Sequence, residues 1–235
     1  MTEHKRIVIT GSSSGLGKSL CEALLDKGGW EVYGIDKDGS PLDCTSYKHL
    51  TCDLTNYKEI EAVVPEFVNL RLPIHVLVNC AGVMPSMLVS SFDPVQALEA
   101  FAVNTVSPLL VSKILLKPLA RSKSGHIINI TSIAAEVRIP GEIVYSATKA
   151  ALKNITENMS SELSRFGIRV NAIAPALVET PLTQHLSGQQ VDFMRSKQAT
   201  IFTVSKDCVT AAMISLIDSP LQVNSSTIYV GGVAK

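Results

Sequence analysis

Short apolar segments alternate with longer amphipathic segments along the whole chain, and this alternation limits the folds that the chain can adopt. Segments such as Lys5 to Thr10 and Ile74 to Asn79 are apolar almost throughout, as expected of strands covered on both faces. Between them lie segments with apolar residues at helical spacing, such as Leu16 to Lys27. Strands separated by helices predict a parallel sheet with right-handed crossovers. We therefore expect a three-layer, doubly wound α/β Rossmann fold with a seven-stranded parallel sheet.

The remaining expected elements follow the same order along the chain. Further strands are expected at Trp30 to Ile35, Lys48 to Cys52, His126 to Ile130, Ile168 to Ala174 and Thr227 to Val230. Further helices are expected at Asn56 to Asn69, Pro94 to Arg121, Tyr145 to Phe166 and Lys206 to Ile217. The longest segment without a predicted element is Pro175 to Ser205, and loops of that length are usually functional. No linker or repeat interrupts the pattern, so residues 1–235 are expected to form one domain.

The charge balance and the cysteine content narrow the classes of partner. The 235 residues include 21 Lys and Arg and 21 Asp and Glu, so the formal net charge is zero. A neutral chain without a basic block is not expected to bind nucleic acid or an anionic membrane. No apolar run approaches the roughly 18 residues that span a bilayer. The five cysteines form no C-x-x-C pair, so we expect no disulfide framework, no metal site and, without an export signal, a location in the cytoplasm.

A glycine-rich segment, Thr10 to Gly17, joins the first expected strand to the first expected helix in the pattern T-G-x-x-x-G-x-G. Gly11 allows a tight turn, Gly15 lets the backbone approach a pyrophosphate, and Gly17 lets the helix pack closely against the strand. The N-terminus of the helix then offers free N–H groups and a partial positive charge to the phosphates. This pattern predicts a dinucleotide site, and the alternative is a plain glycine-rich turn.

Asp36 follows the second expected strand, where an acidic residue can accept hydrogen bonds from the adenosine ribose hydroxyls. A carboxylate there would repel a 2′-phosphate, so it favours NAD over NADP. The neighbouring Lys37 could weaken that discrimination. The alternative is that Asp36 is a solvated acid of a turn.

Tyr145 and Lys149 lie four positions apart at the start of an expected helix, so they share a face about 6 Å apart. A nearby ammonium favours the phenolate of a tyrosine, which makes Tyr145 a candidate general acid or base at a carbonyl or alcohol oxygen. The Y-x-x-x-K spacing alone is weak, because Tyr33 and Lys37 repeat it. That second pair lies on an expected strand, where four residues span about 13 Å and the side chains cannot meet.

Two polar residues accompany this pair. Ser132 follows the strand that ends at Ile130, at the edge of the sheet where ligands bind in parallel folds. Asn104 lies inside a long expected helix, ahead of Pro108, which lacks the N–H that would bond to the Asn104 carbonyl. Taken singly, Ser132 is also compatible with a turn hydroxyl and Asn104 with a local kink.

Together these residues resemble the short-chain dehydrogenase/reductase family, and the resemblance extends from Thr10 to Gly232. The motifs that carry it are Thr10-Gly11 with Gly15 and Gly17, Asp53-Leu54, Asn79-Cys80-Ala81-Gly82, Asn104, Ser132, Tyr145 with Lys149, and Asn171-Ala172 with Pro175. The resemblance implies that Tyr145 donates and accepts the proton. It implies that Lys149 lowers the pKa of Tyr145 and holds the nicotinamide ribose, that Ser132 hydrogen-bonds the substrate oxygen, and that Asn104 positions a water near Lys149.

The resemblance also implies a set of cofactor contacts and an oligomer. The implied contacts are Gly11, Ser13, Ser14, Gly15, Leu16, Gly17, Asp36, Asp53, Leu54, Asn79, Ala81, Gly82, Tyr145, Lys149, Pro175, Val178 and Thr180. A homotetramer or homodimer would form through the long helices 94–121 and 145–166. The chain departs from the family pattern at Cys80, where a second Asn is usual, at Ala176, where Gly is usual, and at 224–226, where Thr-Gly is usual. The segment 36–53 is short and lacks a helix that most members have, which weakens the expected coenzyme preference.

The substrate is expected to lie against three segments, Pro175 to Ser205, Ala134 to Val144 and Val83 to Met87. The first offers an apolar lining of Leu177, Leu182, Leu186, Phe193, Met194 and Phe202, with Gln184, His185 and Arg195 as polar candidates that could equally pack the loop. Glu142 and Arg138 flank Tyr145 and could contact a polar group, although a solvated face is the preferred interpretation.

The expected function is hydride transfer between a nicotinamide cofactor, with NAD(H) favoured, and a small to medium secondary alcohol or ketone. The first alternative is a catalytically silent, NAD-sensing regulatory protein, because a fold does not fix a function. The second is lyase or epimerase chemistry, against which the glycine spacing and the length of the chain count.

Overall fold

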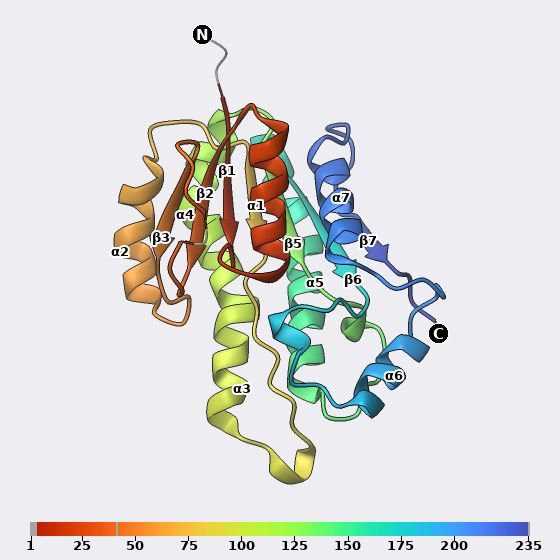
Figure 1. Cartoon of the computed structure of the whole chain (residues 1–235). Helices are drawn as coiled ribbons and strands as arrows, with labels where there is room; N and C mark the ends of the chain where they lie inside the picture. Colours follow the sequence, from red (N-terminus) through yellow and green to blue (C-terminus); the bar gives the residue numbers. More distant parts are fainter. Residues whose placement is uncertain (1–3, 41, 235) are drawn as a thin grey trace.

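The seven expected strands form one parallel sheet in the structure, a computed structural model that describes residues 4–40 and 42–234. The strands are β1 (Lys5–Thr10), β2 (Trp30–Asp36), β3 (Tyr47–Thr51), β4 (Val76–Asn79), β5 (His126–Ile130), β6 (Arg169–Pro175) and β7 (Thr227–Val230). Their order in the sheet is β3-β2-β1-β4-β5-β6-β7, and every neighbouring pair is parallel. The expected doubly wound fold is confirmed (Figure 1).

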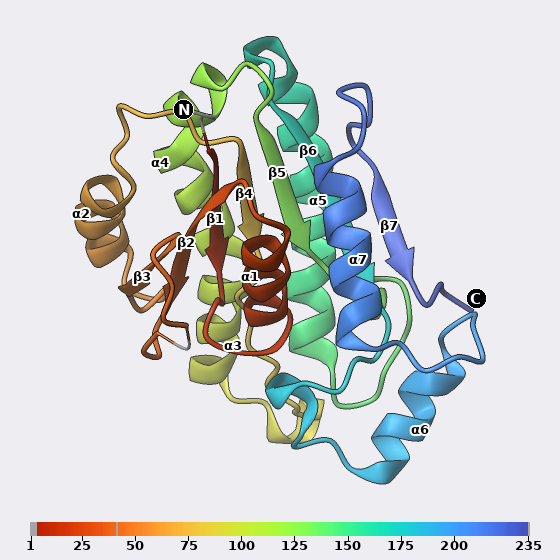
Figure 2. The ribbon, with the colours of Figure 1, turned by 45° about the horizontal axis from the view of Figure 1, so that its top comes forward.

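Helices cover both faces of this sheet, which gives three layers. The helices are α1 (Gly15–Lys27), α2 (Tyr57–Val68), α3 (Pro94–Phe101), α4 (Ser107–Arg121), α5 (Ile143–Leu163), α6 (Gly188–Ser196) and α7 (Lys206–Ile217). Short 3-10 turns lie at Val89–Ser91, Ile133–Ala135, Ser164–Phe166 and Pro181–Thr183. Helices α1 and α7 lie side by side on one face, with α4 and α5 behind the sheet (Figures 1 and 2).

The alternation of side chains along β1 explains the two hydrophobic cores. Ile7 and Ile9 are fully buried in the core that contains residues of α1 and α7. Val8 points to the other face and is buried in the core that contains residues of α2, α4 and α5. Because successive side chains of a strand point to opposite faces, an unbroken apolar run is what a central strand with two covered faces requires.

The expected helix Pro94–Arg121 is continuous, but a π-helical turn separates its α-helical parts α3 and α4. The α3 helix is followed by the π turn Ala102–Val106 and then by α4. Pro108 has no N–H to donate to the carbonyl four residues earlier, and Ser107 N–H donates to the carbonyl of Ala102, five residues earlier. The local register of hydrogen bonds therefore changes at this point, and Asn104 lies within the changed turn.

The continuous helical segment Pro94–Arg121 has the length and apolar composition of a membrane span, which the apolar runs of the sequence did not indicate. Half of its most apolar window is buried within the protein. Helices in the core of a soluble protein can have the same length and composition, so this segment is weak evidence for a membrane span.

The long segment expected to lack regular structure contains the α6 helix. Ser187 Oγ accepts a hydrogen bond from Gln190 N–H, and the Gln190 side chain accepts one from Ser187 N–H. This reciprocal pair is a capping box, a signal for a helix start that the spacing Ser-x-x-Gln carries in the sequence. The expectation of a wholly irregular segment was therefore wrong.

Candidate active site

The candidate site lies where the carboxyl ends of four central strands meet. Thr10 pairs with Asn79, Asn79 with Asn129, and Asn129 with Ala172, so β1 and β4 end at the same level, while β5 and β6 extend one and three residues further. The strand order reverses between β1 and β4, which is the position where parallel α/β sheets open a ligand crevice. A pocket of about 290 Å³ occupies this crevice, with the glycine-rich turn along one side and Tyr145 at the far end.

The glycine-rich turn is shaped to admit a phosphate group. Gly11 has φ +72°, and a Cβ there would lie 2.8 Å from the Cα of Ala81. A Cβ at Gly17 would lie 2.1 Å from the carbonyl oxygen of Gly11. The side chain of Ser14, the N-cap of α1, makes no capping hydrogen bond. The N–H groups at the start of α1 are therefore left for an anion, and the turn fits the expected pyrophosphate.

A side chain from β1 joins the turn to the neighbouring strand end. Thr10 Oγ1 accepts hydrogen bonds from Cys80 N–H at 3.1 Å and from Ala81 N–H at 3.2 Å. The backbone that follows β4 is thereby held against the glycine-rich turn. Cys80 stands where the family usually has Asn, and it lines the pocket. Its position inside the crevice removes it from much of the solvent, and this burial raises the pKa of its thiol to about 12.

At the adenosine end, Asp36 is half-buried and lines the pocket. Its Oδ2 accepts a hydrogen bond from Ser13 N–H at 2.9 Å, and its Oδ1 accepts one from Asp38 N–H at 3.2 Å. Asp36 is thus held in place by two backbone donors, which argues against the alternative of a freely solvated turn acid. Lys37 and Asp53 line the pocket beside it.

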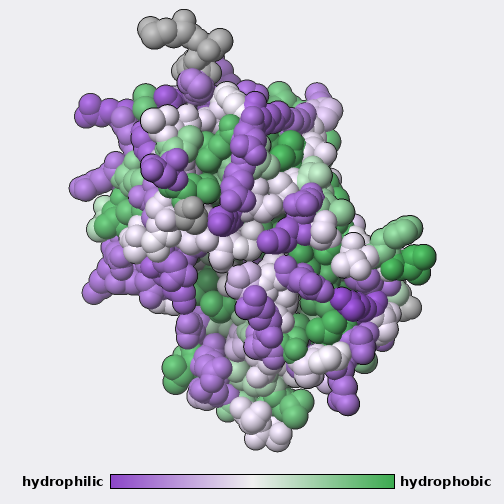
Figure 3. Space-filling view, viewed as in Figure 1, coloured by the Kyte–Doolittle hydropathy of each residue, from purple (hydrophilic) through white to green (hydrophobic). Residues whose placement is uncertain are grey.

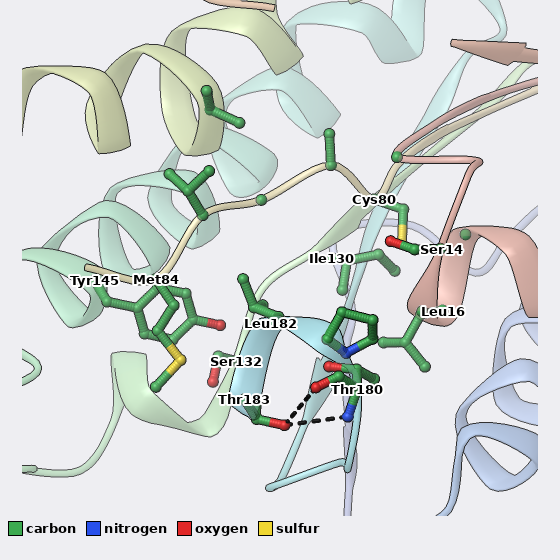
Figure 4. A pocket seen from close by; sticks show the side chains of 18 of the residues that line it. Ser14, Leu16, Cys80, Met84, Ile130, Ser132, Tyr145, Thr180, Leu182 and Thr183 are labelled. Carbon is green, nitrogen blue, oxygen red and sulfur yellow. Dashed lines mark hydrogen bonds between the residues drawn. The ribbon is translucent and has the colours of Figure 1, made fainter. Parts of the chain in front are cut away.

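At the catalytic end, α5 and the end of β5 bring together three of the expected residues. Tyr145, Lys149 and Ser132 are buried and line the pocket. Ser132 Oγ accepts a hydrogen bond from Ala134 N–H at 3.1 Å. Lys149 Nζ donates to the carbonyl oxygen of Ile130 at 2.8 Å and lies 5.7 Å from the centre of the Tyr145 ring. Figure 4 shows the Tyr145 side chain with Ser132 and Met84 beside it.

The pKa values at this end follow from burial. Burial raises the pKa of Tyr145 to about 12, although the nearby Ser132 hydroxyl opposes the rise, while Glu142 and Cys80 add to it. Burial lowers the pKa of Lys149 to about 8. That Lys149 lowers the pKa of Tyr145 stays a prediction, because burial is the largest influence on Tyr145 here. Tyr145 is therefore protonated at neutral pH and ready to act as an acid.

Asn104 does not line the pocket but fixes the backbone beside it. Its Oδ1 accepts a hydrogen bond from Val83 N–H at 2.9 Å, and its Nδ2 donates to Val83 O at 2.8 Å and to Thr148 Oγ1 at 3.0 Å. A Cβ at Gly82 would lie 3.3 Å from Asn104 Oδ1 and 3.5 Å from Lys149 Nζ. Asn104 is fully buried and lies close to Lys149, and the π turn holds the Asn104 side chain in this position.

Most of the implied cofactor contacts line the pocket, and two do not. Ser13 donates through its Oγ to the carbonyl oxygens of Asp38 and Gly39, outside the lining. Asn79 donates through Nδ2 to Asn129 Oδ1 at 2.8 Å, within the sheet. The implied contacts that do line it are Gly11, Ser14, Gly15, Leu16, Gly17, Asp36, Asp53, Leu54, Ala81, Gly82, Tyr145, Lys149, Pro175, Val178 and Thr180.

The structure adds lining residues that no motif indicated. They include Asp38, Cys52, Thr55, Glu99, Val103, Ile130, Thr131, Pro181 and Thr183. Glu99 and Val103 come from α3 and the π turn, so only the packing of that segment against the site reveals them. Ile130 and Thr131 lie between the end of β5 and Ser132, a position that the register of the sheet could have indicated.

The substrate end is apolar, as expected, but uses fewer of the proposed residues. Met84, Leu177, Leu182 and Met194 line the pocket (Figure 4 labels the first and third). Other side chains of the proposed set lie outside the lining. Leu186 and Phe193 pack against the same apolar cluster, Phe202 is 74% exposed, and Gln184, His185 and Arg195 are exposed.

Glu142 contradicts the expectation of a solvated face. The residue is 0% exposed and accepts a hydrogen bond from Ser86 Oγ through Oε1. Its other oxygen, Oε2, is buried without a partner among the described residues. Burial raises the pKa of this carboxyl to about 7. Arg138, in contrast, is exposed as expected.

A family model described as short chain dehydrogenase matches residues 5–191. The chain is 26% identical over 236 residues to a 3-oxoacyl-[acyl-carrier-protein] reductase of Haemophilus influenzae, covering 98% of each chain. It is 30% identical over 246 residues to an L-xylulose reductase of Caenorhabditis elegans, covering 97% of this chain and 94% of the relative.

Two solved structures with bound cofactors resemble the fold closely. A 4-hydroxyisoleucine dehydrogenase complexed with NADH superposes with a TM-score of 0.89 at 26% identity, covering 97% of this chain and 98% of the other. A gluconate 5-dehydrogenase from Burkholderia cenocepacia, in complex with NADP and tartrate, superposes with a TM-score of 0.87 at 26% identity, covering 97% and 94%. The two neighbours hold different coenzymes, so the comparison supports a nicotinamide cofactor without choosing between NAD and NADP.

Proposed function

The chain belongs to the short-chain dehydrogenase family of NAD(P)-dependent oxidoreductases, and we propose that it transfers a hydride between NAD(H) and a small to medium secondary alcohol or ketone. The observation that carries this proposal is the meeting of Tyr145, Ser132 and Lys149 at one end of the pocket, across from an uncapped helix N-terminus. A tyrosine that can transfer a proton and a turn that can bind phosphate lie in one crevice, and this combination supports chemistry on a bound dinucleotide.

The residues present fit a dinucleotide. The turn at Gly11 and the start of α1 would hold the pyrophosphate, and Asp36 would hold the adenosine ribose. Lys149, whose Nζ lies 5.7 Å from the centre of the Tyr145 ring, would hold the nicotinamide ribose. When bound, the nicotinamide supplies or accepts the hydride, which no side chain can do.

The protein's part in the reaction is to hold the oxygen and move its proton. In reduction, the Tyr145 hydroxyl donates its proton to the carbonyl oxygen of the substrate as that oxygen gains charge, and in oxidation the phenolate takes the proton back. Ser132 offers its hydroxyl to the same oxygen. Lys149, with a pKa of about 8, is largely charged at neutral pH and stabilises the phenolate that remains. Asn104 keeps the neighbouring backbone at Val83 in place and, as the resemblance implies, orients a water beside Lys149.

The half-buried carboxylate of Asp36 supports NAD(H) over NADP(H). A 2′-phosphate at that position would bring two negative charges together within a partly desolvated turn. Titration of the protein with NADH and NADPH, followed by nicotinamide fluorescence, tests this preference. We expect NADH to bind at least tenfold more tightly, and Asp36→Asn to reduce that ratio by about tenfold, or about 1.4 kcal/mol. A wild-type protein that binds NADPH as tightly as NADH would contradict the assignment, and binding of neither would contradict the enzyme itself.

The apolar lining supports a substrate with apolar surface. Met84, Leu177, Leu182 and Met194 surround the end of the pocket beside Tyr145. A panel of secondary alcohols and ketones of three to eight or so carbons, assayed with NAD and NADH, is the direct test of this size class. The pocket itself does not favour one direction of the reaction over the other.

We also propose that the chain forms a homo-oligomer through α3 and its neighbours. Val95 and Leu98 on α3 are each 71% exposed, and Ile143 at the start of α5 is 51% exposed. Figure 3 shows hydrophobic residues on the surface at the end of the molecule that holds α3 and α6. Contiguous apolar surface on adjacent helices is typical of an interface. Sedimentation of the wild type and of Leu98→Glu tests this, because a charge there should shift the protein toward the monomer.

A further inference from the structure

The turn that follows β2, residues 36–39, carries the carboxylate of the adenosine end but has little local support. The described residues of the connection to β3 (37–40 and 42–46) form no helix. Asp38 and Gly39 are exposed. The position of the turn must therefore be fixed by contacts from elsewhere in the fold.

The contacts come from β3 and from the glycine-rich turn. His49 on β3 places Nε2 at 2.8 Å from the backbone carbonyl oxygen of Asp38. A carbonyl oxygen only accepts, so Nε2 carries the hydrogen and donates it, and Nδ1 is left as an acceptor. The Tyr47 hydroxyl, 3.0 Å from Nδ1, donates to it. Ser13 Oγ adds hydrogen bonds to the carbonyl oxygens of Asp38 and Gly39 at 3.2 and 3.0 Å.

Tyr47 anchors this arrangement in the interior. The side chain is buried, and its hydroxyl lies 3.2 Å from the Oγ of Ser12, which is 0% exposed. A Cβ at Gly34 would lie 2.2 Å from the Tyr47 oxygen and 2.5 Å from Ser12 Oγ, so glycine makes room for both. We call this chain of hydrogen bonds the Ser12–Tyr47–His49 relay.

The relay acts on Asp36 through Asp38. The Asp38 N–H donates to Asp36 Oδ1 at 3.2 Å, while the Asp38 carbonyl is held by His49. Residue 38 is therefore held on both sides, by the carboxylate that faces the pocket and by the imidazole behind the turn. Loss of the imidazole would leave the Asp38 carbonyl with only the longer bond from Ser13 Oγ, and would loosen one of the two backbone donors that orient Asp36.

We propose that His49 is a positioning residue for coenzyme selection: through the carbonyl of Asp38 it fixes the orientation of the Asp36 carboxylate and thereby the preference for NADH over NADPH. The proposal rests on the proposed function, in which Asp36 binds the adenosine ribose. His49 itself does not line the pocket.

The test is the pair of dissociation constants for NADH and NADPH, measured by nicotinamide fluorescence on the full chain. His49→Leu keeps the apolar bulk but cannot donate, so we expect NADH affinity to fall about tenfold and NADPH affinity to change less than twofold. His49→Gln can place an amide N–H toward the Asp38 carbonyl and should stay within about threefold of the wild type for both coenzymes. Lys48→Ala, on the same strand but directed at Glu31 and Tyr33, is the matched control and should leave both constants unchanged.

The outcomes separate this proposal from the proposed function. An unchanged ratio of the two constants in His49→Leu overturns the role of His49, and so does an equal loss for both coenzymes, which would indicate a merely structural role. If His49→Leu does not fold, Tyr47→Phe replaces it, with an expected threefold fall in the ratio, and an unchanged ratio overturns the proposal. A wild-type protein without NADH preference contradicts the proposed function instead, and removes the basis of this proposal with it.

Discussion

Two carboxylates, Asp36 at the cofactor end of the pocket and Glu142 outside the pocket lining, receive hydrogen bonds from different kinds of donor. At the cofactor end, Asp36 is half-buried and receives hydrogen bonds from the backbone N–H groups of Ser13 and Asp38. Outside the pocket lining, Glu142 is fully buried, receives one hydrogen bond from Ser86, and has one oxygen without a partner among the described residues. Asp36 is thus oriented by two backbone donors, whereas the buried Glu142 has fewer donors than its oxygens can accept, and its charge is therefore costly.

The difference also concerns how each end is built. The cofactor end is made of turns at strand ends, with backbone groups that any dinucleotide can use. The substrate end is made of apolar side chains from the loop around α6 and from the segment at Met84. One fold can thus keep a constant cofactor site and vary its substrate through side chains on a loop.

Tyr145 lies at the end of the pocket away from the glycine-rich turn, and its replacement should separate chemistry from cofactor binding. We expect Tyr145→Phe to lower kcat by about 10³-fold, within the usual range for loss of a general acid, or about 4 kcal/mol. The dissociation constant for NADH should change less than about twofold. Tyr229→Phe is the matched control, because that hydroxyl bonds to Glu136 outside the pocket lining. Steady-state rates with any substrate found in the panel give the answer, and a Tyr145→Phe variant with full activity would show that Tyr145 is not the acid.

Glu142→Gln should sharpen the contrast between the two carboxylates. The pKa of Glu142 is raised from 4.5 to about 7 in the folded protein, so the folded state binds the proton more tightly than the unfolded chain does. Stability from this group is therefore fully present below pH 4.5 and is lost as the pH rises toward 7. The loss amounts to about 3 kcal/mol, since one pKa unit corresponds to about 1.4 kcal/mol.

Urea unfolding between pH 4 and pH 8 measures this term. Relative to the wild type, Glu142→Gln should gain about 3 kcal/mol in the free energy of unfolding across that range. Glu66→Gln, an exposed residue of α2, provides the control and should follow the wild type. If the free energy of unfolding changes with pH in the same way in the wild type and in Glu142→Gln, the prediction is wrong, and neighbouring groups offset the charge of the buried carboxyl.

Leu182→Ala should affect the substrate end alone, with the smallest effect. Removing part of the apolar lining should raise KM for an apolar substrate about fivefold, or about 1 kcal/mol, with little change in kcat. The affinity for NADH should stay the same. Leu221→Ala, a leucine that is 58% exposed, serves as the control. An equal change in NADH affinity would mean that the two ends are not separable as described.

Much of the fold and the site could be predicted from local patterns. The unbroken apolar runs predicted the strands, because a run of that kind suits a strand covered on both faces, and the parallel order followed from the alternation with helices. The four-residue spacing of Tyr145 and Lys149 predicted a shared face, and α5 provides it. The bounds of the helices differed by a few residues, as at the start of α5, where no strong capping signal marks the first turn.

The predictions failed where a residue's surroundings come from distant parts of the chain. Asn79 donates through Nδ2 to Asn129 across the sheet and lies outside the pocket lining, so its contact with the cofactor stays a prediction. Glu142 looked like a solvated acid because its sequence neighbours are ordinary, yet Ser86 and the segment around Met87 enclose it. The α6 helix was missed because its capping box lies within a polar, weakly periodic segment.

The sequence by itself determined the layered α/β architecture, the phosphate turn at Gly11 to Gly17 and the alignment of Tyr145 with Lys149. These features depend on backbone geometry and on residues a few positions apart, so the regular spacing of side chains along a strand or a helix is sufficient to predict them. Tertiary structure alone decided the burial of Glu142, the role of Asn104 at Val83 and the contact of His49 with the turn at Asp38. Such contacts join residues that are distant in the chain, and their energies depend on desolvation and donor geometry that exist only once the sheet has brought the strand ends together.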